Sequence, residues 1–131
     1  MMCKLVRIKT NRNKYVRVAA HKKDCIKGII RIAGDCDYIE QIIVFGSSVE
    51  NRCRKTSDID LAIVSNIPGS RLYRSASYRQ FKRQLYALSD TQMYDVLQFY
   101  SRAAIEKSKD QVCRDIISKG IVVYERNKDG L

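Results

Sequence analysis

The residues of this chain best suited to chemistry are Asp58 and Asp60, two aspartates that lie two positions apart in a strand-forming segment. Side chains alternate between the two faces of a β-strand, so both carboxylates would project from one face, with Ile59 and Leu61 on the other. Like charges at that spacing repel unless a positive ion lies between them. Carboxylate oxygens are ligands that Mg2+ prefers, and the pair therefore predicts a divalent metal site.

A Gly-Ser pair, Gly46 and Ser47, follows the apolar residues 42–45 and precedes the two aspartates. Glycine allows a tight turn and a close approach to a ligand, and backbone N–H groups at the start of a helix can bind phosphate. The serine hydroxyl can donate to a phosphate oxygen. An Asp-x-Asp pair alone is also common on solvated edge strands, but the neighbouring Gly-Ser turn favours a functional site.

The rest of the chain must supply the elements that position these residues. Apolar runs and their spacing predict strands over 40–45, 58–64, part of 92–99 and 121–124, and helices over 71–88 and about 101–119. The expected inward-facing helix residues are Tyr78, Phe81, Leu85 and Leu88, followed by Ile105, Val112 and Ile116. Strands that alternate with helices predict the α/β or α+β class, with helices packed on a single mixed β-sheet.

The N-terminal region allows two interpretations. We favour a helix over about 14–33 that ends at Gly34, because its apolar residues follow helical spacing. The alternative is a β-hairpin in which residues 5–9 and 15–18 form two short strands.

The size and composition of the chain limit the classes of protein to consider. Its 131 residues fit one domain, 1–131, and 25 Lys and Arg against 14 Asp and Glu give a net charge of +11. That charge indicates an anionic partner, although a merely basic surface is the alternative, and no motif of a nucleic-acid reader accompanies it. Five dispersed cysteines and one His do not form a zinc pattern and favour free thiols in the cytoplasm. The sequence contains no apolar run near the ~20 residues of a membrane span.

Gly46-Ser47, a gap of ten residues and Asp58-x-Asp60 together resemble the signature of the DNA polymerase beta-like nucleotidyltransferases. The minimal nucleotidyltransferases, or MNT domains, are the most similar members. The resemblance covers a core of about 38–124, including the closing segment 117–125, and leaves 1–37 as an extension or first helix. It implies the polymerase beta-like fold and transfer of a nucleoside monophosphate, AMP from ATP, to a hydroxyl acceptor with release of pyrophosphate.

The resemblance also implies the roles of particular residues. Asp58, Asp60 and Asp95 would be catalytic and would hold two Mg2+ ions, or Mn2+, and Asp95 would also accept the proton of the acceptor hydroxyl. The nucleoside triphosphate would bind at Gly46, Ser47 and Ser48. Asp90 is the alternative to Asp95 as the third carboxylate.

The chain departs from the family motif at two positions of the turn. Members usually read Gly-Ser-Arg-Ala-x-Gly, but here Ser48 replaces the Arg, and Asn51, a residue that tolerates left-handed turns, replaces the second Gly. Arg52, Arg54 and Lys55 could supply charge for the phosphates instead, or could form a solvated basic loop.

The acceptor is expected to lie on another molecule. Larger members of the superfamily append acceptor-binding domains, for which 131 residues leave no room. The resemblance therefore implies a HEPN-type protein partner, as in HEPN/MNT toxin–antitoxin pairs, or self-association. A catalytically weak antitoxin or binding module that retains the fold is the alternative function.

Overall fold

The computed structural model describes residues 3–52 and 54–126 of the chain, so the expected free thiol of Cys53 lies outside the described residues. Its elements are β1 (Leu5–Lys9), β2 (Tyr15–Ala19), η1 (Ala20–Lys22), α1 (Lys23–Ala33), β3 (Ile39–Phe45), η2 (Gly46–Val49), β4 (Ile59–Ser65), α2 (Gly69–Leu72), α3 (Ala76–Ala87), β5 (Tyr94–Phe99), α4 (Arg102–Lys107), α5 (Gln111–Lys119) and β6 (Ile121–Glu125). The strands predicted from the sequence are confirmed, and the four described cysteines are free. In the described ranges, no helix has the length and apolar character needed to cross a membrane.

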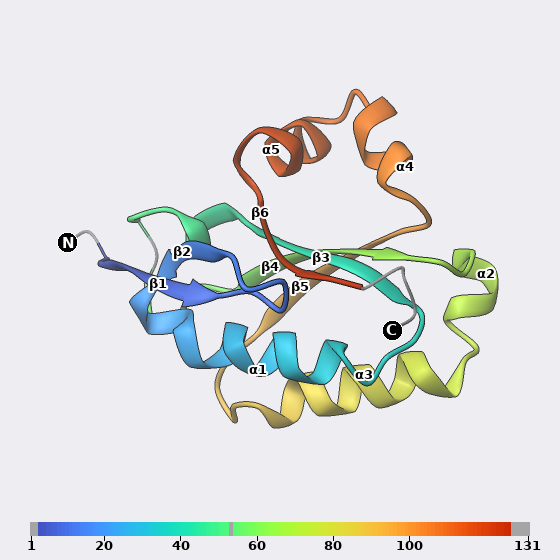
Figure 1. Cartoon of the computed structure of the whole chain (residues 1–131), viewed down its shortest axis with the longest axis horizontal. Coiled ribbons are helices and arrows are strands. Elements are labelled where there is room, and N and C mark those ends of the chain that lie inside the picture. Colours follow the sequence, from blue (N-terminus) through green and yellow to red (C-terminus); the bar gives the residue numbers. More distant parts are fainter. Residues whose placement is uncertain (1–2, 53, 127–131) are drawn as a thin grey trace.

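Four strands form one mixed sheet in the order β5-β4-β3-β6. The strands β4 and β5 are parallel and are connected through α2 and α3, whereas β3 is antiparallel to both of its neighbours. In Figure 1, α1 and α3 lie below the sheet, α4 and α5 lie above it, and the hairpin of β1 and β2 lies at the left. Helices on both faces of one mixed sheet confirm the predicted class.

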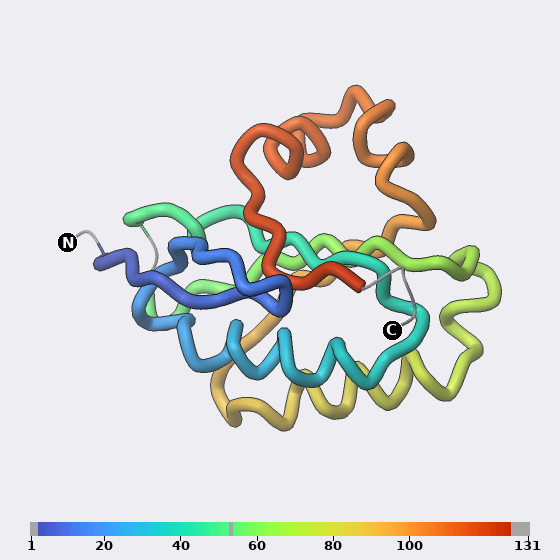
Figure 2. The backbone as a smooth tube through the Cα atoms, in the orientation of Figure 1, coloured from blue at the N-terminus to red at the C-terminus, as the bar shows by residue number. Residues whose placement is uncertain are grey.

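The alternation of side chains along β4 divides the core into two layers. Ile59, Leu61 and Ile63 are buried in the cluster that includes residues of α1 and α3. Ala62 and Val64 are buried on the other face with residues of α4 and α5. The backbone tube in Figure 2 follows the same division, with one helical layer on each side of the strands. Asp60 belongs to the second face by the period of two.

The predicted helix over 14–33 is wrong at its beginning, because Tyr15–Ala19 forms β2 and pairs with β1. The hairpin closes where the N–H of Thr10 donates to the carbonyl of Lys14 at 2.8 Å. Asn13 in this turn has a φ of 62°, a left-handed conformation that Asn tolerates better than most residues. The alternative hairpin interpretation is therefore confirmed, and the helix is confined to η1 and α1.

The single helix expected over 71–88 is interrupted, since α2 ends at Leu72 and α3 begins at Ala76. Ser75 is the reason for the new start: its Oγ accepts a hydrogen bond from the N–H of Tyr78 at 3.1 Å. An N-cap of this kind satisfies a backbone donor that would otherwise lack a partner in the first turn.

The helix expected over 101–119 is also two helices, because α4 ends at Lys107 and α5 begins at Gln111. The new start changes which residues face the sheet. Val112 was predicted to point inward, but its exposed fraction is 46%, and Cys113 is buried in its place.

Candidate active site

Asp60 and Asp95 lie side by side on adjacent parallel strands. The register of β4 and β5 pairs these two residues, so both side chains project from the same face of the sheet. Each is the second residue of its strand. The N–H of Ile59 donates to the carbonyl of Met93 at 3.0 Å, which holds the two strands together where they begin. The structure therefore places both carboxylates at one end of the sheet.

Asp58 joins this cluster from the loop just before β4. Asp58 and Asp95 are exposed, whereas Asp60 is half-buried. Burial raises the pKa of Asp60, and the negative charges of Asp95 and Asp58 raise this pKa further. Asp90 is not among the groups that shift it, and lies in the turn before β5. The electrostatics therefore favours Asp95 over Asp90 as the third carboxylate.

Three carboxylates that repel one another are a donor set suited to a hard divalent cation. Across residues 3–52 and 54–126, however, no three His, Cys, Asp or Glu side chains are grouped in a way that could hold a metal ion. Asp58 and Asp95 are exposed, so other rotamers are open to them. The residue types and their common location fit a cation site, and their roles as metal ligands stay predictions.

The turn after β3 requires glycine at position 46 for two reasons. Gly46 has a φ of +73°, a left-handed conformation that costs glycine little. A Cβ at this position would also collide with Oδ2 of Asp60. Phe45, the preceding residue, pairs with Asp60 across β3 and β4. The turn therefore brings the backbone of η2 directly against the carboxylate.

The two serines of the turn differ in accessibility. Ser47 is half-buried, whereas Ser48 is fully buried, and its hydroxyl has no hydrogen-bond partner among the described residues. A contact of Ser48 with a triphosphate would therefore have to come from its backbone. The nucleotide-binding roles of Gly46, Ser47 and Ser48 stay predictions.

The loop after η2 does not need a second glycine. Among the described non-glycine residues, only Asn13 has a positive φ, so Asn51 does not imitate a left-handed glycine. The carbonyl of Asn51 instead accepts a hydrogen bond of 2.7 Å from the N–H of Cys3, at the base of the N-terminal hairpin.

Of the basic residues in the loop, Arg52 forms an ion pair, whereas Arg54 and Lys55 face solvent. Nε of Arg52 lies 2.6 Å from Oε2 of Glu50, although the Arg52 side chain remains 70% exposed. Arg54 and Lys55 are exposed. A triphosphate would have to compete with Glu50 for Arg52, whereas Arg54 and Lys55 are accessible from solvent.

Lys22 is a residue of this end of the sheet that the sequence analysis missed. It ends η1 and is fully buried, and its Nζ donates to the carbonyls of Lys55 and Ser57 and to Oε1 of Gln92. Lysine is rarely buried, so a sequence pattern assigns a lysine in a helix to the exposed face. These three acceptors lie 33 to 70 positions further along the chain.

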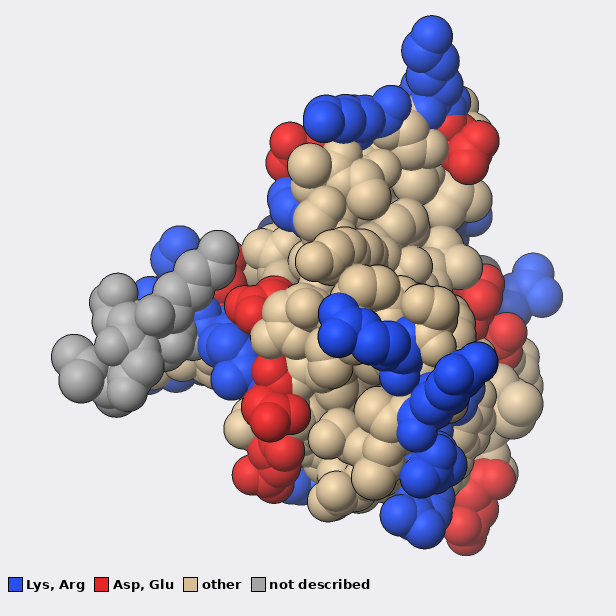
Figure 3. Space-filling view, turned by 90° about the vertical axis from the view of Figure 1, so that its right-hand side faces the viewer, with Lys and Arg blue, Asp and Glu red and all other residues tan. Residues whose placement is uncertain are grey.

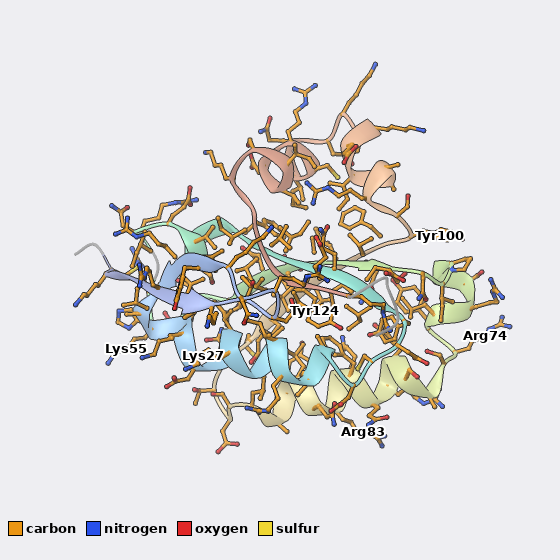
Figure 4. All side chains as sticks on the ribbon, viewed as in Figure 1. Lys27, Lys55, Arg74, Arg83, Tyr100 and Tyr124 are labelled. Carbon is orange, nitrogen blue, oxygen red and sulfur yellow. The ribbon has the colours of Figure 1, made fainter. Side chains whose placement is uncertain are left out.

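A large hollow lies at the other end of the sheet. A hollow of about 950 Å³ is bounded by the beginning of β3 and the ends of β4, β5 and β6, and its lining includes Glu40, Tyr100, Arg102 and Arg126. Figure 4 shows Tyr100 at the right of the molecule and Lys55 at the left. Figure 3 looks onto this right-hand side, where basic side chains project from the upper lobe and from the lower body, with acidic side chains among them.

Comparisons with known proteins identify the family and the fold of the chain. The model of the family described as "Polymerase beta, Nucleotidyltransferase" matches residues 27–129, and the chain therefore belongs to this family. Seven solved chains match, among them one from a crystal structure of the toxin–antitoxin MntA-HpeT in a mutant with two Asp-to-Glu substitutions two positions apart. The solved chain is 15% identical to this protein, and the two superpose with a TM-score of 0.53. The match covers 79% of this chain and 76% of the solved chain, and it establishes the fold. No curated protein sequence matches this chain.

Proposed function

We propose that this protein is a magnesium-dependent nucleotidyltransferase that moves AMP from ATP to a hydroxyl group of a protein acceptor. Membership of the family supports nucleotidyltransferase activity in general. The observation that carries the particular proposal is the register of β4 and β5, which sets Asp60 beside Asp95 next to the Gly46 turn. We keep the prediction that the protein acts in the cytoplasm.

The chain's own residues have separate tasks in this reaction. Asp58, Asp60 and Asp95 would hold two Mg2+ ions, which when bound would supply positive charge to the phosphates and acidify the acceptor hydroxyl. The backbone of η2 and the hydroxyl of Ser47 would orient the triphosphate. The acceptor oxygen forms a bond to the α-phosphorus, and the bond between that phosphorus and the bridging oxygen of the β-phosphate breaks. Asp95 would accept the hydroxyl proton, and pyrophosphate would leave.

A protein acceptor is supported by two observations. The solved chain that shares this fold comes from a toxin–antitoxin pair, and the aspartates substituted in it have the same spacing as Asp58 and Asp60. The net charge of +11 suits an acidic partner surface and would speed association with one. We propose a HEPN-type protein or a second copy of this chain as the acceptor.

The test is transfer of label from ATP. The purified chain is incubated with Mg2+, a candidate acceptor protein and ATP labelled at either the α- or the γ-phosphate. We expect the acceptor to gain label from the α-position only, and chelation of Mg2+ to abolish the transfer. Asp58→Asn and Asp60→Asn should each reduce the rate by at least about a hundredfold, whereas the exposed Asp24→Asn should leave it unchanged.

Three results would contradict the proposal. Label from the γ-phosphate would indicate phosphoryl transfer, and a wild-type rate in Asp60→Asn would remove the carboxylate cluster from the mechanism. Stable binding of the partner without any transfer would favour the alternative, a binding module that retains the fold.

A further inference from the structure

Lys22 occupies an unusual position for a lysine. It is fully buried where η1 meets α1, and its Nζ lies 3.0 Å from the carbonyl oxygen of Lys55, 2.5 Å from that of Ser57 and 2.8 Å from Oε1 of Gln92. These oxygen acceptors suit the N–H donors of an ammonium group. Burial of a charged amine is costly unless such partners are present, so these contacts must persist for the side chain to stay inside.

The acceptors of Lys22 belong to the two segments that carry the carboxylates. Ser57 directly precedes Asp58, and Gln92 lies three positions before Asp95. Gln92 itself donates from Nε2 to the carbonyl of Ser57 at 2.9 Å and to the carbonyl of Met93 at 2.7 Å. The hydrogen-bond network therefore joins the entrance of β4 to the entrance of β5.

The segment before Asp58 needs such support. Its local hydrogen bonds run from Arg54 to Ser57, where the N–H of Arg54 donates to Oγ at 2.9 Å and the N–H of Ser57 donates to the carbonyl of Arg54 at 3.0 Å. These bonds shape the turn without attaching it to the sheet. Lys22 attaches the same turn to the body of the protein through two carbonyls.

We propose that Lys22 is a positioning residue that, with Gln92, fixes Asp58 and Asp95 relative to each other so that they can share bound cations. This inference rests on the proposed function, because it assigns the shared ligands. Lys22 touches neither substrate nor cation in this role. It acts through the backbone of Ser57 and the side chain of Gln92.

The experiment compares Lys22→Met with Arg126→Met. Arg126 provides a matched control, since it is a cation that donates to the carbonyls of Ile39 (3.1 Å) and Cys36 (2.8 Å) at the opposite end of the sheet. Denaturant unfolding, calorimetric titration of Mn2+ in the presence of a non-hydrolysable ATP analogue, and hydrogen exchange over residues 54–60 and 92–95 are measured for both variants and the wild type.

We expect both variants to lose stability, but only Lys22→Met to bind Mn2+ about 10–100-fold more weakly, the usual cost of losing a residue that orients metal ligands. Exchange should become faster in 54–60 and 92–95 in that variant alone. A folded Lys22→Met with wild-type Mn2+ affinity and wild-type exchange would overturn the inference. If Lys22→Met does not fold, Gln92→Leu takes its place, because it removes the half-buried amide that contacts Lys22 and Ser57. Its Mn2+ affinity and its hydrogen exchange are judged in the same way.

The two proposals can fail separately. A wild-type protein that binds Mn2+ but transfers no label would contradict the proposed function only. The Mn2+ affinity of Lys22→Met relative to the wild type would still decide the role of Lys22. A wild-type protein that binds no Mn2+ would contradict both, because Asp58 and Asp95 would then share no cation. A wild-type protein that transfers label, with Lys22→Met equal to it in every readout, would contradict only the role of Lys22.

Discussion

The two ends of the central sheet are built differently, although at each end a buried or half-buried cation binds backbone carbonyls. At one end, Asp60 lies beside Asp95 and near Asp58. Burial is the main cause of the raised pKa of Asp60, and the negative charges of Asp95 and Asp58 raise this pKa further. At the other end, carboxylates have polar partners: Glu106 pairs with Arg102 at 3.3 Å, and Glu125 accepts from Gln41 at 3.1 Å.

The hollow lined by Arg102 and Arg126 and the crowded carboxylates are thus at opposite ends of the sheet. The cavity of about 950 Å³ lies at the end where charges have partners. Uncompensated like charges mark a functional site better than volume does, because a fold retains such repulsion at a cost in stability. At the carboxylate end Asp58 and Asp95 are exposed, which suits a reaction on the surface of another macromolecule.

The largest expected effect comes from the third carboxylate. Asp95→Asn should reduce nucleotidyl transfer by at least about a hundredfold. Asp90→Asn should leave it unchanged, because Asp95 and Asp58, and not Asp90, are the charges that raise the pKa of Asp60. Both rates are measured with α-labelled ATP at saturating Mg2+. The opposite ranking of the two variants would show that the register of β5 does not define the site.

Gly46→Ala should affect both stability and transfer. The left-handed backbone alone should cost about 1–3 kcal/mol, and the added methyl group would displace the carboxylate of Asp60. Denaturant unfolding measures the first effect and label transfer the second. Gly69→Ala is the control, since only Tyr73 lies near its Cβ, at 3.7 Å, and it should change stability by less than about 1 kcal/mol. Equal effects of the two substitutions would contradict the close approach of η2 to Asp60.

Asp60→Asn should stabilise the folded chain at neutral pH when a chelator removes metal ions. The pKa of Asp60 is raised in the folded state, so the folded chain binds this proton more tightly than the unfolded chain. The free energy of unfolding of the wild type therefore increases as the pH falls through the raised pKa. The Asp60→Asn variant has no titrating group at this position and lacks this contribution. The stability difference between variant and wild type, from urea unfolding at a series of pH values, should be largest at neutral pH and should vanish in acid. A difference that grows in acid would mean that the carboxylate is stabilised in its charged form.

The smallest effect is expected at the cavity end. Arg102→Ala removes a hydrogen bond of 3.0 Å to Oε1 of Gln41 and the exposed pair with Glu106, so it should cost about 0.5–1.5 kcal/mol of stability. Transfer of label should be unchanged. A large loss of transfer with normal ATP binding would instead assign the acceptor to the cavity, and the two ends would then serve one reaction.

The sequence determined the features that depend on local chemistry and periodicity. Asp58 and Asp60 were predicted from a spacing of two, Gly46 from the need for a tight turn, and the strands from short apolar runs. Each of these follows from neighbouring residues along the chain, and the family match over 27–129 confirms the class that they indicated. At the N-terminus the sequence favoured a helix over the hairpin, and the pairing of β1 with β2 in the structure overturned that prediction.

Only the tertiary structure decided how distant segments meet. The position of Asp95 beside Asp60 depends on the register of β5 against β4, and the restart of α5 buries Cys113 in place of Val112. The acceptors of Lys22 on Lys55, Ser57 and Gln92 lie 33 to 70 positions away, so the residues around Lys22 in the sequence do not reveal these contacts. Such contacts depend on how strands and loops pack in three dimensions, and a one-dimensional pattern of residue types does not encode the pairing that brings them together.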